Sequence, residues 1–359
     1  MRILFLGNIQ SVHLRRWVSS AVMAGDQAAV CSFVRGECEV EVSLLRTFGF
    51  GKAAYLFCVP QLNRLVRQFR PDVVHAHYLT SYGALASLAG CRPLVVTAWG
   101  SDLLPVPTTS AFHRWAARQA VQKADIVTVV ASHMTASALT LGADPDRIET
   151  VSFGVDLALF KPKTALPAHG LPRIVCTRNF DDVYRVDTLI AAVARLKNEG
   201  RRLRLHLIGD GPRRGRLQRL AKTLGVGADV AFLGSCVPSE VADELASADL
   251  FVSPSISDGN NVSLTEAMAC GAFPIATDIA ANRHWIESGV TGLLFPSGDA
   301  CALARALATA LDSPELRQHA KRINLEVVRQ QANWDNSVAR MRELYQRVID
   351  DVRHARMVA

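Results

Sequence analysis

The feature that most constrains the fold is a repeated alternation of short apolar runs with helix-like segments along nearly the whole chain. In the first half, the apolar runs 2–7 and 70–78 alternate with helical patterns at 13–26 and 112–123. Apolar runs of this length are typical of strands buried on both faces of a sheet. Their alternation with helices predicts an α/β fold built on parallel, doubly wound sheets.

The alternation breaks once, near the middle of the chain. Residues 159–172 contain three prolines and little periodicity, which is typical of a linker. The pattern then restarts at 173 and runs to a strongly helical end near 352. A chain of 359 residues is long enough for two domains, and we expect them at 1–160 and 173–335. Two like-sized halves also predict a cleft for a ligand.

Composition narrows the class of protein. The eight cysteines form no C-x-x-C pair and lie mostly among apolar residues, which favours buried thiols in a reducing cytoplasm over disulfides or zinc. No run of 18 apolar residues is present to span a bilayer, and the first apolar run is too short for a signal peptide. The net charge of +7 is compatible with anionic substrates or an anionic membrane face.

The stretch 248–277 carries the strongest functional signal. An apolar run beginning at Leu250 leads into a Ser, Pro, Asp, Gly and Asn loop, and a helix is expected from about Val262 to a left-handed cap at Gly271. A polar loop between the carboxyl end of a strand and a helix N-terminus is where open α/β sheets bind ligands. Exposed N–H groups at such a terminus attract phosphate.

Two carboxylates, Asp258 and Glu266, bracket this loop with seven residues between them. An ordinary alternative is a solvated loop acid and an unrelated helix Glu. The pattern D-x7-E, followed by EAMACG, closely resembles the E-x7-E signature of the retaining glycosyltransferases of family 4, the glycosyl transferases group 1. That resemblance implies a GT-B fold, in which two Rossmann-like domains face a cleft and the C-terminal helix, 336–359, packs back on the first domain. It places Glu266 on the nucleotide ribose and Asp258, one methylene shorter than the usual Glu, beside the donor sugar.

The resemblance also assigns the phosphate-binding cations. Family members commonly have an Arg after the first strand of the second domain and a Lys several residues later, both directed at the diphosphate. This chain has Arg178 at the first position, but Tyr184 aligns with the Lys and Arg185 follows it. Either Arg185 supplies the second charge, or Tyr184 donates only a hydrogen bond; a solvated surface arginine is the ordinary alternative for each.

Backbone groups are expected to complete the donor site. The loop Gly259, Asn260, Asn261, Val262 and Ser263 offers successive N–H groups at a helix N-terminus, although Asn and Ser are also ordinary turn and cap residues. By resemblance, these residues lie near the donor sugar and phosphates. The resemblance further implies that Gly7 and Asn8, after the first strand, form the facing loop and approach the diphosphate.

Candidates for the acceptor side come from the first half. The strand 93–102 ends in Trp99 and Asp102, and some relatives have a catalytic histidine where this chain has Trp99. A Trp cannot transfer protons, but its ring can pack under a sugar and its N–H can donate; a half-buried core Trp is the alternative. His75 and His77 share one face of a strand and, without a third metal ligand in view, are most often structural. His77 and His13 are retained as acceptor candidates, and no metal site is expected.

Other motifs carry less information. GDGPRRG at 209–215 has the wrong spacing for a dinucleotide fingerprint and is interpreted as a turn, as is the D-x-D sequence at 144–146. The basic clusters at 15–16, 64–70 and 213–219 lack interleaved aromatics, which argues against nucleic-acid binding. Solvated helix faces are the default interpretation for these clusters, and peripheral contact with an anionic membrane is the sharper hypothesis.

We therefore expect a retaining, metal-independent glycosyltransferase that needs no cofactor beyond its donor substrate. It would move a sugar from a nucleoside diphosphate sugar to a glycan or lipid-linked acceptor in surface polysaccharide biosynthesis, at the inner face of the membrane or in the cytoplasm. Asp258, Arg178 and Arg185 are the predicted catalytic residues. The alternatives are a nucleotide-sugar epimerase of the same fold and a non-catalytic module that binds nucleotide sugar or glycan.

Overall fold

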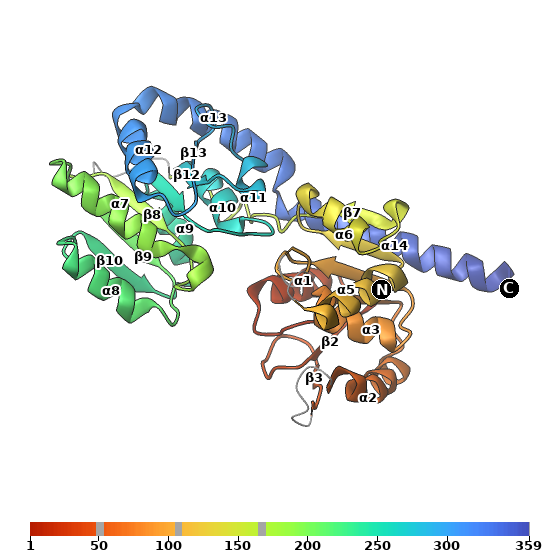
Figure 1. Ribbon diagram of the computed structural model, residues 1–359. Helices are drawn as coiled ribbons and strands as arrows, with labels where there is room; N and C mark the ends of the chain where they lie inside the picture. Colours follow the sequence, from red (N-terminus) through yellow and green to blue (C-terminus); the bar gives the residue numbers. More distant parts are fainter. Residues whose placement is uncertain (48–53, 105–109, 164–169, 359) are drawn as a thin grey trace. The chain divides into compact units, whose positions relative to one another are not determined.

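A computed structural model describes residues 1–47, 54–104, 110–163 and 170–358 (Figure 1). The chain divides into two compact units, one formed by Met1–Phe153 with Asn336–Ala359 and the other by Gly154–Asp335. The first unit ends before the expected position at 160, because Val155 and Phe160 are buried in a core of the second unit. Of the expected linker, residues 164–169 lie outside the described part of the chain.

The first unit is built on a seven-stranded parallel sheet with the strand order β3-β2-β1-β4-β5-β6-β7. Its central strands are buried along their whole length, as their apolar sequences predict. The order reverses between β1 and β4, so the carboxyl ends of these two strands flank a topological switch point. The strands are β1 (Arg2–Leu6), β2 (Gln27–Ser32), β3 (Val42–Leu44), β4 (Val73–His77), β5 (Leu94–Ala98), β6 (Ile126–Val129) and β7 (Ile148–Thr150).

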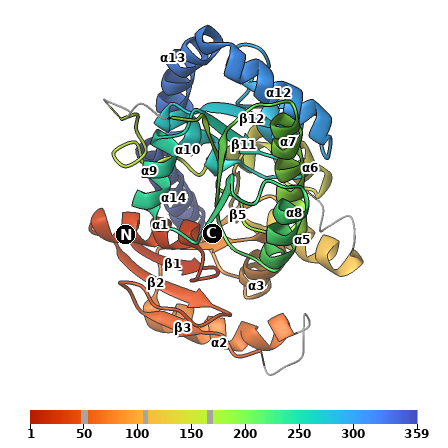
Figure 2. The same ribbon diagram turned by 90° about the vertical axis from the view of Figure 1, so that its left-hand side faces the viewer.

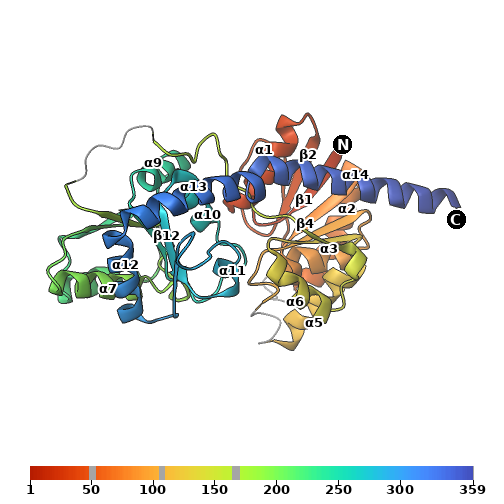
Figure 3. The same ribbon diagram turned by 90° about the horizontal axis from the view of Figure 1, so that it is seen from above.

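Helices cover both faces of this sheet. Right-handed crossovers place α2, α3, α5 and α6 on one face and α1 on the other, and α3 contacts both α2 and α5. The last helix lies on the α1 face (Figure 3), where Met341 and Tyr345 line a small cavity with Trp17. The helices are α1 (Val12–Met23), α2 (Ala54–Phe69), α3 (Ala84–Leu88), α5 (Ala111–Lys123), α6 (Thr135–Thr140) and α14 (Trp334–Val358).

The second unit repeats the plan with six parallel strands in the order β10-β9-β8-β11-β12-β13. The neighbouring strands β11 and β12 are labelled in Figure 2. The order reverses between β8 and β11, and the loops that follow these two strands meet at the switch point. The strands are β8 (Arg173–Cys176), β9 (Arg204–Ile208), β10 (Val230–Gly234), β11 (Leu250–Ser253), β12 (Phe273–Thr277) and β13 (Leu293–Phe295). The helices are α7 (Val186–Asn198), α8 (Arg214–Thr223), α9 (Pro238–Ala246), α10 (Val262–Cys270), α11 (Ala280–Arg283), α12 (Ala300–Asp312) and α13 (Pro314–Gln331).

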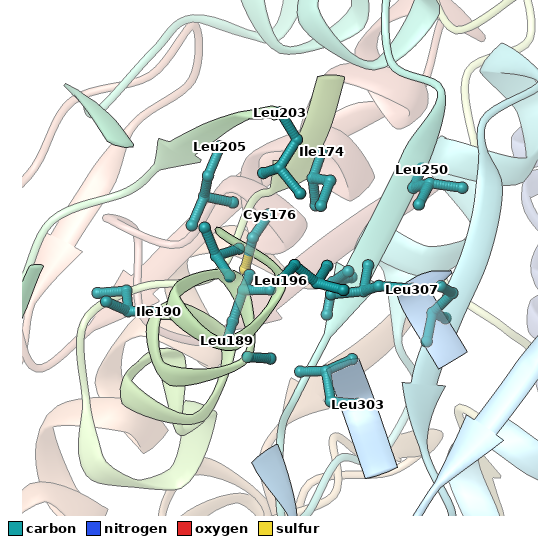
Figure 4. Packing of buried hydrophobic residues seen from close by; sticks show 14 of the residues in the cluster. Ile174, Cys176, Leu189, Ile190, Leu196, Leu203, Leu205, Leu250, Leu303 and Leu307 are labelled. Carbon is teal, nitrogen blue, oxygen red and sulfur yellow. The ribbon is translucent and has the colours of Figure 1, made fainter. Parts of the chain in front are cut away.

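Two hydrophobic cores hold the second unit together. On one face, leucines of α7 and α12 pack on apolar residues of the central strands (Figure 4). On the other face, α9 and α10 pack on the sheet, and Met268 of α10 is fully buried with Phe251 of β11. Because nearly every side chain of α10 is buried, packing fixes this helix on the sheet, and with it the position of its N-terminus.

The strand and helix alternation is confirmed in both units, and so is the α/β fold. The expected helix start at Val262 and the left-handed cap at Gly271, with φ 84°, are also confirmed. The helix α13 was not predicted, and α3 is preceded by a π-helical turn at Leu79–Gly83.

The minor motifs take the expected structural form. Residues 144–146 lie in a turn that leads into a short 3-10 helix, with Asp144 capping its first amide. All eight cysteines are free thiols. In the described part of the chain, no helix combines the length and apolarity needed to cross a bilayer.

Candidate functional site

Arg178 lies at the switch point of the second unit, directly after β8, and is 8% exposed. Its Nε donates to Ser253 Oγ at 3.1 Å. Its Nη2 donates to Asp258 Oδ2 at 2.5 Å and also to Asn261 Oδ1. Within the described residues, Nη1 makes no hydrogen bond. Arg178 is therefore held in one orientation by three side chains, with one guanidinium nitrogen left for a ligand.

Asn261 connects this guanidinium to α10. It is the N-cap of the helix, and its Oδ1 accepts a hydrogen bond from the Leu264 amide at 3.1 Å. Its Nδ2 donates to Ser253 Oγ at 3.0 Å and to Asn282 Oδ1 at 2.8 Å. Asn282 in turn donates to the carbonyl of Thr277 at 2.8 Å. This buried polar network ties the ends of β11 and β12 to the start of α10, which makes the site rigid.

The N-terminus of α10 presents unused donors beside Arg178. Within the described residues, the backbone N–H groups of Gly259, Asn260, Asn261 and Ser263 donate to no protein acceptor. Asn260 is 9% exposed, and neither its Nδ2 nor its Oδ1 has a hydrogen-bond partner among the described residues. Unsatisfied buried amides are costly. Free N–H groups, the helix dipole and a fixed guanidinium together make a binding place for an anion.

The two carboxylates of the D-x7-E pattern have different surroundings. Asp258 stays on the loop with its side chain 14% exposed and pairs with Arg178 through Oδ2. Within the described residues its Oδ1 accepts no hydrogen bond, so one oxygen is available to a ligand hydroxyl. Glu266 lies in the second turn of α10 and is partly buried. The sequence spacing did not indicate that Asp258 and Arg178 form an ion pair.

Tyr184 lies beside Arg178, whose guanidinium carbon is 5.3 Å from the centre of the Tyr184 ring. Burial raises the pKa of the Tyr184 phenol, so it stays neutral at physiological pH and can donate a hydrogen bond. Arg185 has left-handed backbone, with φ 45°, and its Nε donates to Asp187 Oδ1 at 3.2 Å. Its side chain lines a pocket of about 340 Å³ with residues such as Arg216. Arg185 therefore belongs to this neighbouring pocket, while Tyr184 stacks on Arg178.

The GDGP turn packs against the backbone of the loop that carries Arg178. A Cβ on Gly209 would lie 2.7 Å from the carbonyl oxygen of Arg178, and one on Gly211 would lie 2.9 Å from that of Phe180. Both glycines have positive φ, at 134° and 156°. Only glycine permits this close approach, so the motif is a turn, as expected, and it positions the loop that carries Arg178.

In the first unit, Gly7 and Asn8 follow β1 at the switch point. A Cβ on Gly7 would lie 2.9 Å from Leu14 Cδ2 and 3.4 Å from His77 Cβ, so a larger residue here would displace the Leu14 side chain where α1 packs on β4. Asn8 is exposed, and its Oδ1 accepts a hydrogen bond from the Gln10 amide at 2.9 Å. The structure therefore gives Gly7 a packing role, independent of any ligand.

His75 and His77 are fully buried, and burial lowers the pKa of both rings, that of His75 to about 3. His75 is a structural residue with hydrogen bonds of 2.6 Å to the hydroxyls of Tyr345 and Thr97. Trp99 Nε1 donates to His77 Nδ1 at 3.3 Å. Because indole only donates, the neutral His77 ring carries its proton on Nε2, a buried donor that has no partner in the described residues.

Two acceptor candidates have structural surroundings. Asp102 is fully buried and accepts hydrogen bonds from the amides of Leu79, Trp99 and Gly100 at 2.7–2.9 Å. Burial raises its pKa to about 6. Both of its oxygens hold the turn after β5, which gives Asp102 a structural role, and contact with an acceptor remains a prediction. His13 is partly buried and stacks on the Phe153 ring with centroids 4.5 Å apart.

No group of three or more His, Cys, Asp or Glu side chains in the described ranges is placed to hold a metal ion. The positive charge at the switch point of the second unit comes from Arg178 and the start of α10.

Comparison with known proteins identifies the family. The model for "Glycosyl transferases group 1" matches residues 161–326, and the model for "Glycosyl transferase 4-like" matches 2–131. The D-inositol 3-phosphate glycosyltransferase 1 of Catenulispora acidiphila is 30% identical over 307 residues, which cover 78% of this chain and 73% of that relative. This chain belongs to the group 1 glycosyl transferases. A D-inositol 3-phosphate glycosyltransferase of Thermomonospora curvata is also 30% identical, over 59% of this chain, and the match spans about half of that relative, 54% of its length.

The glycosyltransferase also resembles solved structures along nearly its whole length. Anabaena Alr3699/HepE in complex with UDP and glucose superposes with a TM-score of 0.82, covering 96% of this chain and 99% of that one at 20% identity. This confirms the GT-B fold expected from the sequence.

Some functional groups of this glycosyltransferase were missed by sequence reasoning. Ser253, Thr277 and Asn282 complete the network around Arg178 and Asn261. Ser253 and Thr277 end the strands β11 and β12, a position that marks residues at a binding edge. Asn282 gives no such signal, because its contact with Asn261 joins α11 to the start of a different helix, α10.

Proposed function

We propose that this glycosyltransferase transfers a sugar from a nucleoside diphosphate sugar to a glycan or lipid-linked acceptor, with retention of configuration and without a metal ion. The donor would bind to the second unit, with its diphosphate at the N-terminus of α10. The acceptor would bind to the first unit, near His13, His77 and Trp99. A role in surface polysaccharide biosynthesis, in the cytoplasm or at the inner face of the membrane, completes the proposal.

One observation carries the donor assignment: a rigidly held guanidinium lies beside the start of α10, and in the described ranges one of its nitrogens and several N–H groups of the helix start have no acceptor. Fixed donors and cations of this kind stabilise a departing diphosphate without reorganising during the reaction. They supply the positive potential for which other enzymes use a metal ion. The complex of Alr3699/HepE with UDP and glucose supports a nucleotide-sugar donor.

The proposed reaction breaks the bond between the anomeric carbon and the diphosphate oxygen. An acceptor hydroxyl forms the new bond on the same face, and its proton passes to the departing phosphate. The leaving electron pair stays on the diphosphate, where Arg178 Nη1 and the amides of residues 259–261 and 263 would stabilise it. This scheme needs no protein base, in keeping with the pairing of Asp258 to Arg178.

The carboxylates would hold the donor at two places. Glu266 would accept hydrogen bonds from the ribose hydroxyls, as the family resemblance implies. Asp258 would accept from a sugar hydroxyl through Oδ1, while Oδ2 keeps Arg178 in place. Asn260, with both amide atoms unpaired, would add a donor and an acceptor for the sugar. Tyr184 would donate from its neutral hydroxyl where relatives have a Lys.

The experiment that tests this proposal measures thermal protection by UDP, UDP-glucose and other nucleoside diphosphate sugars, since a ligand raises the unfolding temperature by mass action. We expect protection by at least one donor and at least a tenfold loss of its affinity in Glu266→Gln, because a buried ribose contact to a charged group contributes about 1.5–3 kcal/mol. Glu315→Gln, an exposed change at the start of α13, is the control. Equal affinity in Glu266→Gln and the control would refute the ribose assignment.

Activity then separates the alternatives. Once a donor that protects the protein is found, sugar transfer is assayed to glycan and lipid-linked acceptors. D-inositol 3-phosphate, which appears in the names of the relatives, is assayed as a further acceptor. An α-linked product from an α-linked donor would support retention. Turnover that persists with metal chelated would support metal independence. Conversion of the donor without any acceptor would instead favour an epimerase.

A further inference from the structure

The helical layer formed by α2, α3 and α5 on one face of the first unit carries only positive charge. Residues 54–70, 84–88 and 111–123 contain no Asp or Glu. They contain six basic residues, and all six are exposed: Arg64, Arg67, Arg70, Arg114, Arg118 and Lys123. The three helices lie next to one another (Figure 1), so their charges share one surface.

In the described part of the chain, five of these six charges are not neutralised as basic residues are elsewhere in the same unit. On α14, Arg340 and Arg347 pair with Glu149, and Arg342 pairs with Asp26. By contrast, no carboxylate in the described ranges lies within 4.0 Å of Arg64, Arg67, Arg70, Arg118 or Lys123. Because like charges on one surface repel each other, such a layer is best stabilised by an anionic partner.

Large aromatic side chains are exposed on the same layer. Trp115 is 42% exposed and Phe112 is 37% exposed, with ring centroids 5.9 Å apart in the first turns of α5. Phe57, in the first turn of α2, is 53% exposed. In a parallel α/β sheet, helices begin at the carboxyl edge, so all three rings lie toward the edge where this fold binds substrates.

Basic side chains together with exposed Trp and Phe match the interface of a bilayer. Arginine and lysine attract anionic headgroups, and the amphipathic Trp ring is favoured at the level of those headgroups. Binding of an acidic protein needs no exposed aromatic edge. A nucleic-acid site places its aromatic rings along a positively charged groove, whereas the three rings here lie toward one edge of the layer. We propose that the layer α2/α3/α5 is the surface through which this protein binds an anionic phospholipid bilayer, with Phe112 and Trp115 inserted among the headgroups.

Vesicle co-sedimentation of the full chain tests this proposal. We expect binding to vesicles of phosphatidylcholine mixed with phosphatidylglycerol, weakened by salt, and little binding to pure phosphatidylcholine. Arg67→Gln with Arg118→Gln should reduce affinity by about tenfold or more, since each basic residue near an anionic surface contributes roughly 1 kcal/mol. Arg219→Gln with Lys222→Gln, which removes the same charge from α8, is the matched control and should leave affinity unchanged.

Fluorescence reports insertion directly. Of the five tryptophans, Trp115 is exposed, whereas Trp17 and Trp285 are buried. Brominated lipid should therefore quench the emission of the wild type, and Trp115→Phe should lose most of that quenching while keeping its binding to anionic vesicles. Equal vesicle binding by both double variants, or quenching that survives Trp115→Phe, would overturn the proposal. So would binding to duplex DNA but not to vesicles. Binding is measured without substrate, so the result does not depend on the proposed reaction.

Discussion

The two switch points of this protein have the same topology but different chemistry. In the second unit, the edge carries a guanidinium, amides and hydroxyls in one hydrogen-bonded network around the start of α10. In the first unit, the edge carries buried imidazoles, an indole and a carboxylate held by backbone amides. The shared topology thus determines where in each unit a site can form, whereas the residues at that edge determine which class of ligand can bind. The edge of the second unit is positively charged and suits an anion, whereas the edge of the first unit holds neutral imidazoles and is sensitive to acid.

The largest expected effect concerns the charge of the second unit. Arg178→Ala should lower kcat by roughly 100-fold to 1000-fold, as loss of one fixed transition-state donor does, with a smaller change in donor KM. Arg185→Ala, whose guanidinium pairs with Asp187 outside this network, should cost far less. Steady-state kinetics, with unfolding curves to confirm that both variants are folded, checks this. An equal loss of kcat in the two variants would instead indicate that Arg185 is the second phosphate-binding charge.

The next effect concerns acid and the first unit. The pKa of His75 is about 3 in the folded state and 6.5 in the unfolded state. Between these two pH values the unfolded chain therefore binds a proton at His75 and the folded chain does not. Stability is therefore full above pH 6.5 and falls between pH 6.5 and 3. At pH 5 the loss is about 2 kcal/mol from His75, and His77 shifts in the same direction.

Urea unfolding of the whole chain at pH 7 and pH 5 measures this loss of stability, with a spectroscopic probe in each unit to follow its unfolding. His75→Gln should flatten the dependence of the first unit on pH, even though its stability at pH 7 falls. The raised pKa of Asp102 adds stability as the pH falls and so opposes the loss from His75. The difference in pH dependence between the wild type and His75→Gln is therefore the decisive measurement, and no difference between them would contradict a buried neutral His75 ring.

A moderate effect is expected from the network that holds α10. Asn261→Ala removes the N-cap and leaves Asn282 and Ser253 without one partner each, which should destabilise the second unit by about 1–3 kcal/mol. Asn198→Ala, at the exposed end of α7, is the matched control and should change stability by less than about 0.5 kcal/mol. Thermal unfolding of both variants compares them, and equal stability would mean that packing alone positions α10.

The smallest expected effect is at Trp99. Trp99→Phe keeps an aromatic ring but removes the N–H that donates to His77 Nδ1, so stability should fall by about 1 kcal/mol or less. Nitrogen NMR shifts of His77 report the tautomer. We expect the proton on Nε2 in the wild type and a mixture of tautomers in the variant. A wild-type ring protonated on Nδ1 would rule out the hydrogen bond from Trp99.

Much of the fold follows from the sequence because its signals are local. The apolar strands, the start of α10 and the glycine cap at Gly271 depend on neighbouring residues, and all were predicted correctly. The helix α13 was missed because its partly buried, largely polar sequence lacks a clear apolar stripe.

The site was only partly predictable, since its contacts join distant segments. Arg178 and Asp258 are 80 residues apart, and spacing alone does not show that they pair. Asp102 has the sequence surroundings of a binding residue, but its burial and its three backbone donors become visible only in three dimensions. Asn282 likewise has no sequence signal, although it completes the hydrogen bonding of Asn261.

The central claim is that a nucleoside diphosphate sugar binds to the second unit at the start of α10. Hydrogen–deuterium exchange with and without UDP tests it most directly, because the amides of residues 259–263 that have no protein acceptor would gain one from the phosphates. The account predicts slower exchange at residues 177–185 and 258–266 in the presence of UDP. Protection confined to other segments, or none at a UDP concentration that stabilises the protein, would contradict it.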